Sequence, residues 1–137
     1  MSTSDFRVLH TMLRVQDMER SIDFYTRLLG MRLLFRKDHL KNQFTQAYVG
    51  YGEEPEHMAI ELVFNWNQEE PYEQGSAFGH VAIGVSDIFR LCDGLTAENV
   101  PMPRPPKSQK HHENVIAFIE DPDGYKIELV EQKSAEA

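Results

Sequence analysis

The sequence predicts an α+β fold made of two copies of a βαβββ module, whose strands form a curved mixed sheet. Two observations predict it. The segment that begins at His10 is repeated at His80, with polar and apolar residue types in the same order. Each half then ends in a strand-like segment with a central glutamate, Glu61 in the first half and Glu128 in the second. A duplication of this kind is typical of a domain built from two similar halves.

The repeat also defines the domain. Aligned without a gap, the stretches 10–20 and 80–90 share His, Val, Asp and Arg at corresponding positions. Two copies are too few for the stacked array of a solenoid protein, so we interpret them as modules of a single domain. That domain is expected to cover residues 1–137, with modules at about 6–66 and 76–131.

The first module begins with a strand, because the side chains of residues 8–15 alternate between two faces. Asp17 is the expected N-cap of a helix whose apolar residues recur at helical spacing as far as Leu29. Gly30 is suited to end that helix, since glycine accepts the left-handed conformation of a C-terminal stop. Three further strand candidates lie at 31–37, 45–50 and 57–64.

The second module begins with a strand at 80–85 and continues with a helix from Asp87 to about Glu98. Gly94 is a weak point inside that helix. A proline-rich connection follows at 101–106. The chain then predicts a hairpin of strands 115–120 and 125–131, because the intervening Asp-Pro-Asp-Gly sequence has the residues that a tight turn requires.

Composition excludes several classes of protein. The net charge of −8 argues against nucleic acid or an anionic membrane as the main partner, although local basic residues could still bind a small anion. No apolar run approaches the length of a membrane span, and the N-terminal residues lack the apolar core of a secretory signal. Cys92 is the single cysteine, so no intrachain disulfide can form. We therefore expect a cytoplasmic protein.

The repeated His and Glu residues are candidate metal ligands. Apolar neighbours of His80, Glu61 and Glu128 occupy the opposite face of each strand, so the polar side chains share the inner face of the sheet. An isolated histidine on a strand is usually structural, but two imidazoles and two carboxylates in register form a four-ligand nitrogen and oxygen site. The proposed set is His10, Glu61, His80 and Glu128. The remaining histidines have no repeat partner and are predicted to be structural: His39, His57, His111 and His112.

With these residues in place, the sequence resembles the glyoxalase I family of the vicinal oxygen chelate superfamily. The resemblance covers nearly the whole chain, and its longest and most specific stretch is 115–129. Shorter matching stretches lie at 10–15, 21–31, 60–62, 65–66 and 78–80. The metal ligands of that family fall on the same four residues that the repeat selects.

The resemblance implies a metal-dependent lyase that detoxifies methylglyoxal. Such an enzyme converts the hemithioacetal of methylglyoxal and glutathione into S-lactoylglutathione by proton transfer through a metal-stabilised enediolate. It also implies a homodimer in which His10 and Glu61 of one chain complete a site with His80 and Glu128 of the other. Glu128 is then the expected catalytic base, and Glu61 is expected to assist on the opposite face of the substrate.

The family's substrate contacts fall on Arg14, Asn65 and Lys110. Arg14 and Asn65 each lie four residues beyond a ligand on the same strand face, where a guanidinium and an amide could hold the carboxylate and the backbone of glutathione. One divalent metal is expected per site. Nickel is preferred because the short chain resembles the nickel and cobalt type of glyoxalase I, with cobalt, zinc and manganese as alternatives.

Other functions on the same fold remain open at this point. A dioxygenase of this superfamily would hold iron with two histidines and one carboxylate, and the fourth candidate ligand argues against it. An epimerase or a thiol transferase is harder to exclude, but neither predicts the match over 115–129. A non-catalytic binding dimer would need a cleft but no metal. Metal content and an assay with methylglyoxal and glutathione separate these alternatives.

Overall fold

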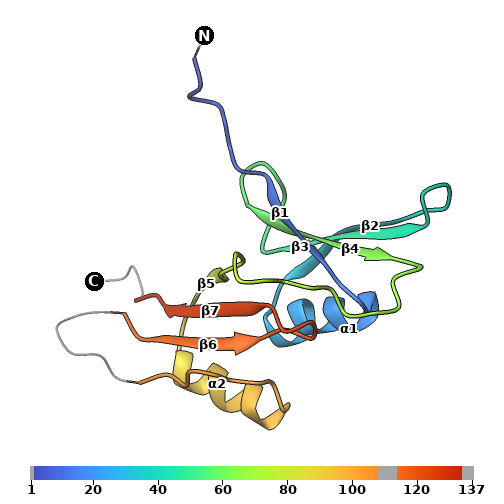
Figure 1. Ribbon diagram of the computed structural model, residues 1–137. Helices are drawn as coiled ribbons and strands as arrows, with labels where there is room; N and C mark the ends of the chain where they lie inside the picture. The colour runs from blue at the N-terminus through green and yellow to red at the C-terminus, as the bar shows by residue number, and fades with distance from the viewer. Residues whose placement is uncertain (1, 108–113, 134–137) are drawn as a thin grey trace. The chain divides into compact units, whose positions relative to one another are not determined.

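The strands of the protein lie in two mixed sheets, one in each of two units, Met1–Glu73 and Gln74–Ala137 (Figure 1). The computed structural model describes residues 2–107 and 114–133. In each unit the first strand is parallel to the last one, and a helix connects that first strand to the rest of the sheet. This arrangement confirms the predicted α+β class.

The first unit has the predicted βαβββ order. Its four strands are arranged as β1-β4-β3-β2, with β1 parallel to β4 and the other neighbours antiparallel. The elements are β1 (His10–Arg14), α1 (Met18–Asp23), a π-helical turn η1 (Phe24–Leu28), β2 (Arg32–His39), β3 (Phe44–Gly50) and β4 (Ala59–Asn65). Each strand lies within about two residues of its predicted range.

The first helix begins and ends where the sequence predicts, but its second half is wound differently. The Asp17 carboxylate accepts a hydrogen bond from the Arg20 amide, as expected of an N-cap. From Phe24 onward the helix widens into a π-helical turn, in which the amide of Leu29 donates to the carbonyl of Phe24. Gly30, at φ +76°, ends it as predicted.

The described residues of the second unit contain one strand fewer than the predicted module. Its elements are β5 (Val81–Val85), α2 (Ile88–Ala97), β6 (Ile116–Glu120) and β7 (Lys126–Glu131), in the sheet order β5-β7-β6. Among the described residues, the proline-rich connection contributes only a bridge between Arg104 and Phe118. Prolines lack the amide hydrogen that a strand interior must donate, so this segment cannot extend the bridge into a strand.

The predicted hairpin turn is confirmed. The Asp121 carboxylate accepts hydrogen bonds from the amides of Asp123 and Tyr125, and Gly124 has φ +84°. The turn therefore fixes the start of β7, the strand that carries Glu128. The N-terminus of α2 is held from the same strand, because the amide of Ile88 donates to the Glu131 carboxylate at 3.1 Å.

The core of each unit lies between its helix and one face of its sheet. In the first unit α1 packs on β4, where Ile60 and Leu62 are buried on either side of Glu61 in the sequence. In the second unit α2 packs on β7, where Ile127 and Leu129 are fully buried on either side of Glu128. The prediction that helices cover the apolar face is confirmed, and it leaves both glutamates on the uncovered face. Within the described ranges, none of the helices combines the length and the apolar character that a bilayer crossing requires.

Candidate metal centre

The first candidate pair joins the two neighbouring strands β1 and β4. His10 is in register with Ala59, so Glu61 lies two residues further along β4 and its side chain projects from the same face. The Nε2 atom of His10 is 3.4 Å from Oε1 of Glu61. Both side chains are only partly exposed, at 31% and 15%.

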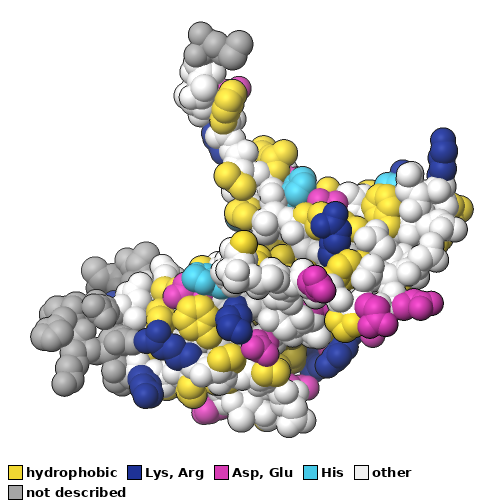
Figure 2. Space-filling model, in the orientation of Figure 1, with side chains coloured by type: hydrophobic (Ala, Val, Ile, Leu, Met, Phe, Trp, Pro, Cys, Tyr) yellow, Lys and Arg dark blue, Asp and Glu magenta, His cyan; other side chains and the backbone are white. Residues whose placement is uncertain are grey.

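The second candidate pair repeats this geometry in the other unit. His80 immediately precedes β5, whose first residue, Val81, is in register with Ile127. Glu128 therefore stands in the same diagonal relation to His80 as Glu61 does to His10. The Nε2 atom of His80 is 3.2 Å from Oε1 of Glu128. Figure 2 shows histidine next to acidic side chains at the surface of each unit.

These distances fit two ligands of one metal ion. Two donor atoms that each bind a metal at about 2.1 Å lie about 3.0 Å apart at a right angle and about 3.4 Å apart at the tetrahedral angle. A histidine–glutamate hydrogen bond has a similar length, so it is the recurrence of the pair on the same diagonal that favours a metal. Within the described part of either unit, no third His, Cys, Asp or Glu joins the pair in a metal-binding group. Each unit therefore supplies half of the predicted four-ligand set.

Three side chains that the sequence analysis did not select surround the first pair. Glu54, in the loop between β3 and β4, places Oε1 3.0 Å from Nδ1 of His10. Gln46, on β3, donates a hydrogen bond to Oε2 of Glu61 at 2.8 Å. Tyr48, also on β3, is in register with Glu61, and its ring meets that of His10 edge to face at 5.1 Å. Burial, followed by the negative charges of Glu61 and Glu54, raises the pKa of the Tyr48 phenol, which is therefore neutral at physiological pH.

The signal that would have identified Gln46 and Tyr48 is their place on the inner face of a strand that pairs with β4. Which residues of β3 lie beside Glu61 depends on the register between β3 and β4, and the alternation of side chains within one strand does not predict that register. Glu54 lies in a loop and has no periodic signal at all.

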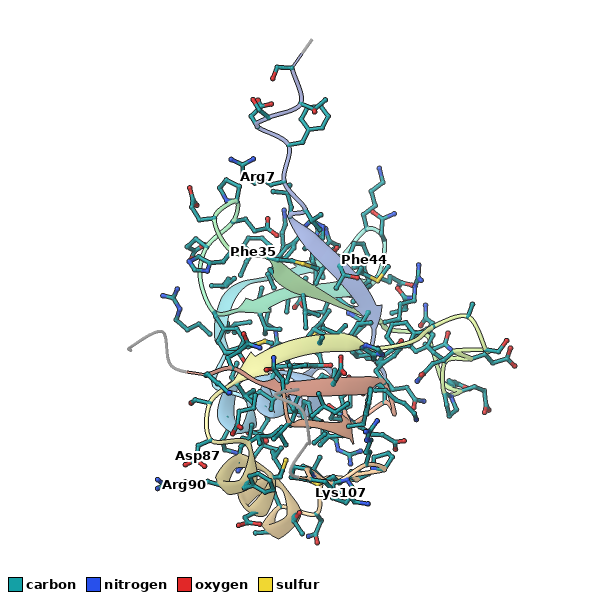
Figure 3. All side chains as sticks on the ribbon, turned by 90° about the vertical axis from the view of Figure 1, so that its left-hand side faces the viewer. Arg7, Phe35, Phe44, Asp87, Arg90 and Lys107 are labelled. Carbon is teal, nitrogen blue, oxygen red and sulfur yellow. The ribbon has the colours of Figure 1, made fainter. Side chains whose placement is uncertain are left out.

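A hollow of about 530 Å³ adjoins the first pair. It is lined by side chains from β2, from β3 and from the loop before β4, including Phe35, which projects from the first sheet in Figure 3. Gln46, Tyr48 and Glu54 all reach this hollow. A small organic molecule in this hollow would lie against the side chains that contact His10 and Glu61.

The predicted substrate contacts on β1 and β4 repeat the diagonal of the ligand pair. Arg14, at the end of β1, is in register with Val63, so Asn65 lies two residues further along β4. The Asn65 amide also donates to the Tyr72 hydroxyl at 3.2 Å, which fixes its orientation. Lys110, His111 and His112 lie outside the described residues. His39 accords with the predicted structural role, since its ring stacks on Phe44.

Comparisons with known proteins agree with this reading of the chain. The model of the Glyoxalase/Bleomycin resistance protein/Dioxygenase superfamily matches residues 7–129. A probable lactoylglutathione lyase from Synechocystis is 49% identical over 127 residues, which cover 93% of this chain and 96% of the relative. A lactoylglutathione lyase from Neisseria meningitidis is 47% identical over 95% of this chain and 94% of its own length.

Solved structures give the same family. Glyoxalase I from Zea mays matches with a TM-score of 0.87 and 37% identity over 93% of this chain. This chain spans 45% of the maize chain. Since the family model and the relatives all cover both units, the chain belongs to the Glyoxalase/Bleomycin resistance protein/Dioxygenase superfamily and, within it, to the glyoxalase I family.

Proposed function

We propose that this protein is a lactoylglutathione lyase, which converts the hemithioacetal of methylglyoxal and glutathione into S-lactoylglutathione. The observation that carries the proposal is the recurrence of one His/Glu pair, on one strand diagonal, in both units of a chain that is 46–49% identical to lactoylglutathione lyases. We place the enzyme in the cytoplasm, where glutathione keeps thiols reduced.

Membership of the glyoxalase I family implies a divalent metal cofactor. His10, Glu61, His80 and Glu128 would hold it, since imidazole and carboxylate donors suit nickel, cobalt, zinc and manganese alike. Nickel is our preferred metal because the short chain resembles the nickel and cobalt type of glyoxalase I. The four donors come from both units, and we propose that residues 1–137 form one glyoxalase-type domain of two modules.

We further propose that the protein is a homodimer with shared sites. Because the described residues of each unit include two of the four candidate ligands, a four-ligand site needs one unit of each kind. In a symmetric dimer, one chain would contribute His10 and Glu61 and the other chain His80 and Glu128, which gives two equivalent sites. Apolar side chains exposed on the first unit are available to a dimer interface: Phe6, Val8, Leu9, Met12, Leu33 and Phe35.

The reaction moves one proton between neighbouring carbons of the substrate, and a second proton from the hydroxyl oxygen to the former ketone oxygen. The proposed residue roles concern the transfer between the carbons. Glu128 is the proposed base, which takes the proton from the carbon that carries the sulfur and returns it to the adjacent carbon. Glu61 is the residue that we propose to assist from the opposite side of the substrate. When bound, the metal would stabilise the negative charge that develops on the substrate oxygens.

The remaining contacts position the thiol portion of the substrate. Arg14 lies four residues beyond His10 on the same strand, about 13 Å away at the usual strand rise. That distance suits a carboxylate at the end of a tripeptide, which a guanidinium can bind with two parallel hydrogen bonds. Asn65 and Lys110 are proposed as further glutathione contacts.

The test combines metal analysis with an activity assay. The purified protein is stripped with a chelator, titrated with Ni²⁺, Co²⁺, Zn²⁺ or Mn²⁺, and assayed with methylglyoxal and glutathione by the absorbance of the thioester product. We expect no activity without metal, and the highest kcat/KM with Ni²⁺. A protein that binds metal but forms no thioester would point to an epimerase or a thiol transferase. A protein that binds no metal would point to a binding dimer.

A further inference from the structure

The His10 ring is held by two side chains, Glu54 and Tyr48, and Nε2 is the ring nitrogen that remains available to a ligand. Its Nδ1 atom is 3.0 Å from the Glu54 carboxylate, to which it donates a hydrogen bond. The ring edge meets Tyr48 at a centroid distance of 5.1 Å and an interplanar angle of 75°. With the proton on Nδ1, the lone pair of Nε2 points toward Glu61. This is the tautomer that a histidine needs to bind a metal through Nε2.

The Glu61 carboxylate is held in a corresponding way by Gln46. The Gln46 amide nitrogen donates to Oε2 of Glu61 at 2.8 Å and to the Tyr48 hydroxyl at 3.2 Å. Its oxygen is 3.0 Å from Nε2 of His39, from which it accepts a hydrogen bond. Both amide hydrogens and the amide oxygen are therefore used, and a flipped amide would set oxygen against carboxylate.

His39 is itself fixed, so the orientation of Gln46 has a rigid support. Its ring lies parallel to that of Phe44, at an interplanar angle of 9° and a centroid distance of 4.3 Å. Phe44, at the start of β3, is labelled in Figure 3. Because Gln46 binds Oε2 of Glu61, Oε1 is the oxygen of this carboxylate that faces His10.

The second pair has no such support among the described residues. In the register of β6 and β7, Phe118 lies opposite Glu128 as Tyr48 lies opposite Glu61, and Ile116 takes the place of Gln46. The ring of Phe118 meets His80 edge to face at 5.3 Å, but neither Phe118 nor Ile116 can donate a hydrogen bond to a carboxylate.

We propose that Glu54 and Gln46 are positioning residues that hold His10 and Glu61 in their metal-binding geometry, so that the first pair is the rigid half of the metal centre. The inference rests on the proposed function, because it assumes that these two residues bind metal. Carboxylates that accept from the outer nitrogen of a ligating histidine fix its tautomer and make it a stronger donor. Gln46 limits Glu61 to one free oxygen.

Metal affinity of the full-length protein tests the proposal without relying on catalysis. The dissociation constant for Co²⁺ is measured by competition with a chromogenic chelator, and the visible spectrum of bound Co²⁺ reports its coordination. Glu54→Ala and Gln46→Leu should each weaken binding about 10- to 100-fold, the usual effect of removing such a partner. Glu54→Gln should lose less, since its amide oxygen can still accept from Nδ1. Thermal unfolding of the metal-free proteins identifies any variant that fails to fold, and Glu54→Gln then carries the test.

Glu56→Ala is the matched control, because Glu56 is an exposed carboxylate in the same loop. It should bind Co²⁺ with the wild-type constant. If Glu54→Ala and Gln46→Leu also bind with the wild-type constant while His10→Ala binds no metal, the positioning role is wrong and the metal centre stands. If His10→Ala binds Co²⁺ as the wild type does, the metal centre itself is wrong, and the inference is overturned with it.

Discussion

The two units of the chain each have a histidine and a glutamate on the same strand diagonal, but the side chains around this pair differ. In the first unit, His10 and Glu61 are hydrogen-bonded to Glu54 and Gln46. In the second unit, the side chain next to His80 is the apolar ring of Phe118. The strands that carry the two pairs are hydrogen-bonded in the same way in both units. The difference therefore comes from the side chains of the neighbouring strand and from the loop between β3 and β4, which carries Glu54 and is longer than the turn between β6 and β7.

This difference suggests how two similar halves can take different parts in one reaction. A base must change its position and protonation during the reaction, whereas a ligand that fixes a metal must not. Glu61 has its outer oxygen bound by an amide. Glu128 has His80 as the one partner that the described residues give its carboxylate. The second unit is therefore better suited to supply the base, and the first unit is better suited to hold the metal.

The largest expected effect comes from exchanging the two glutamates for glutamine. At saturating metal, Glu128→Gln should lower kcat by about 10²- to 10⁴-fold, the usual contribution of a general base. Glu61→Gln should mainly weaken metal binding and lower kcat less. Steady-state kinetics at increasing Ni²⁺ concentrations separate the two effects. Equal losses of kcat at saturating metal would mean that the two units share the proton transfer equally.

The sequence was sufficient to predict the two His/Glu pairs, because their signal is local. Side chains alternate between the two faces of a strand, so Glu61 and Glu128 lie on the face opposite their buried apolar neighbours. The internal repeat then pairs each glutamate with the histidine of its own half, His10 or His80. The same local signals located the helix start at Asp17 and the turn that contains Gly124.

The residues that contact the first His/Glu pair could not be predicted in this way. Gln46 meets Glu61 only through the register of β3 on β4, and Glu54 only through the conformation of a loop. Both are tertiary properties. The π-helical turn after Asp23 was also not predicted, because the spacing of the apolar residues from Met18 to Leu29 fits an ordinary α-helix.

A smaller loss of activity is expected from substitution of Arg14, the last residue of β1. Arg14→Ala should lower kcat/KM by the equivalent of about 1.5–3 kcal/mol, which is the range for a hydrogen bond to a charged group. Arg14→Lys should recover part of the loss, since an ammonium cannot form the paired hydrogen bonds of a guanidinium. Metal content should stay at the wild-type level in both variants, because the ligands are intact. Unchanged kinetics in Arg14→Ala would remove this residue from the glutathione site.

The smallest expected effect, a factor of two, bears most directly on how the two units combine. A heterodimer is prepared from one His10→Ala chain and one Glu128→Ala chain, with different affinity tags to isolate it. If each site takes its first pair from one chain and its second pair from the other, both lesions fall in one site and the second site is intact. The heterodimer should then keep about half of the wild-type activity and bind one metal per dimer, while both mutant homodimers are nearly inactive. If each site is formed within one chain, both sites of the heterodimer carry a lesion. An isolated heterodimer without activity would therefore show that the two units of a single chain build the site together.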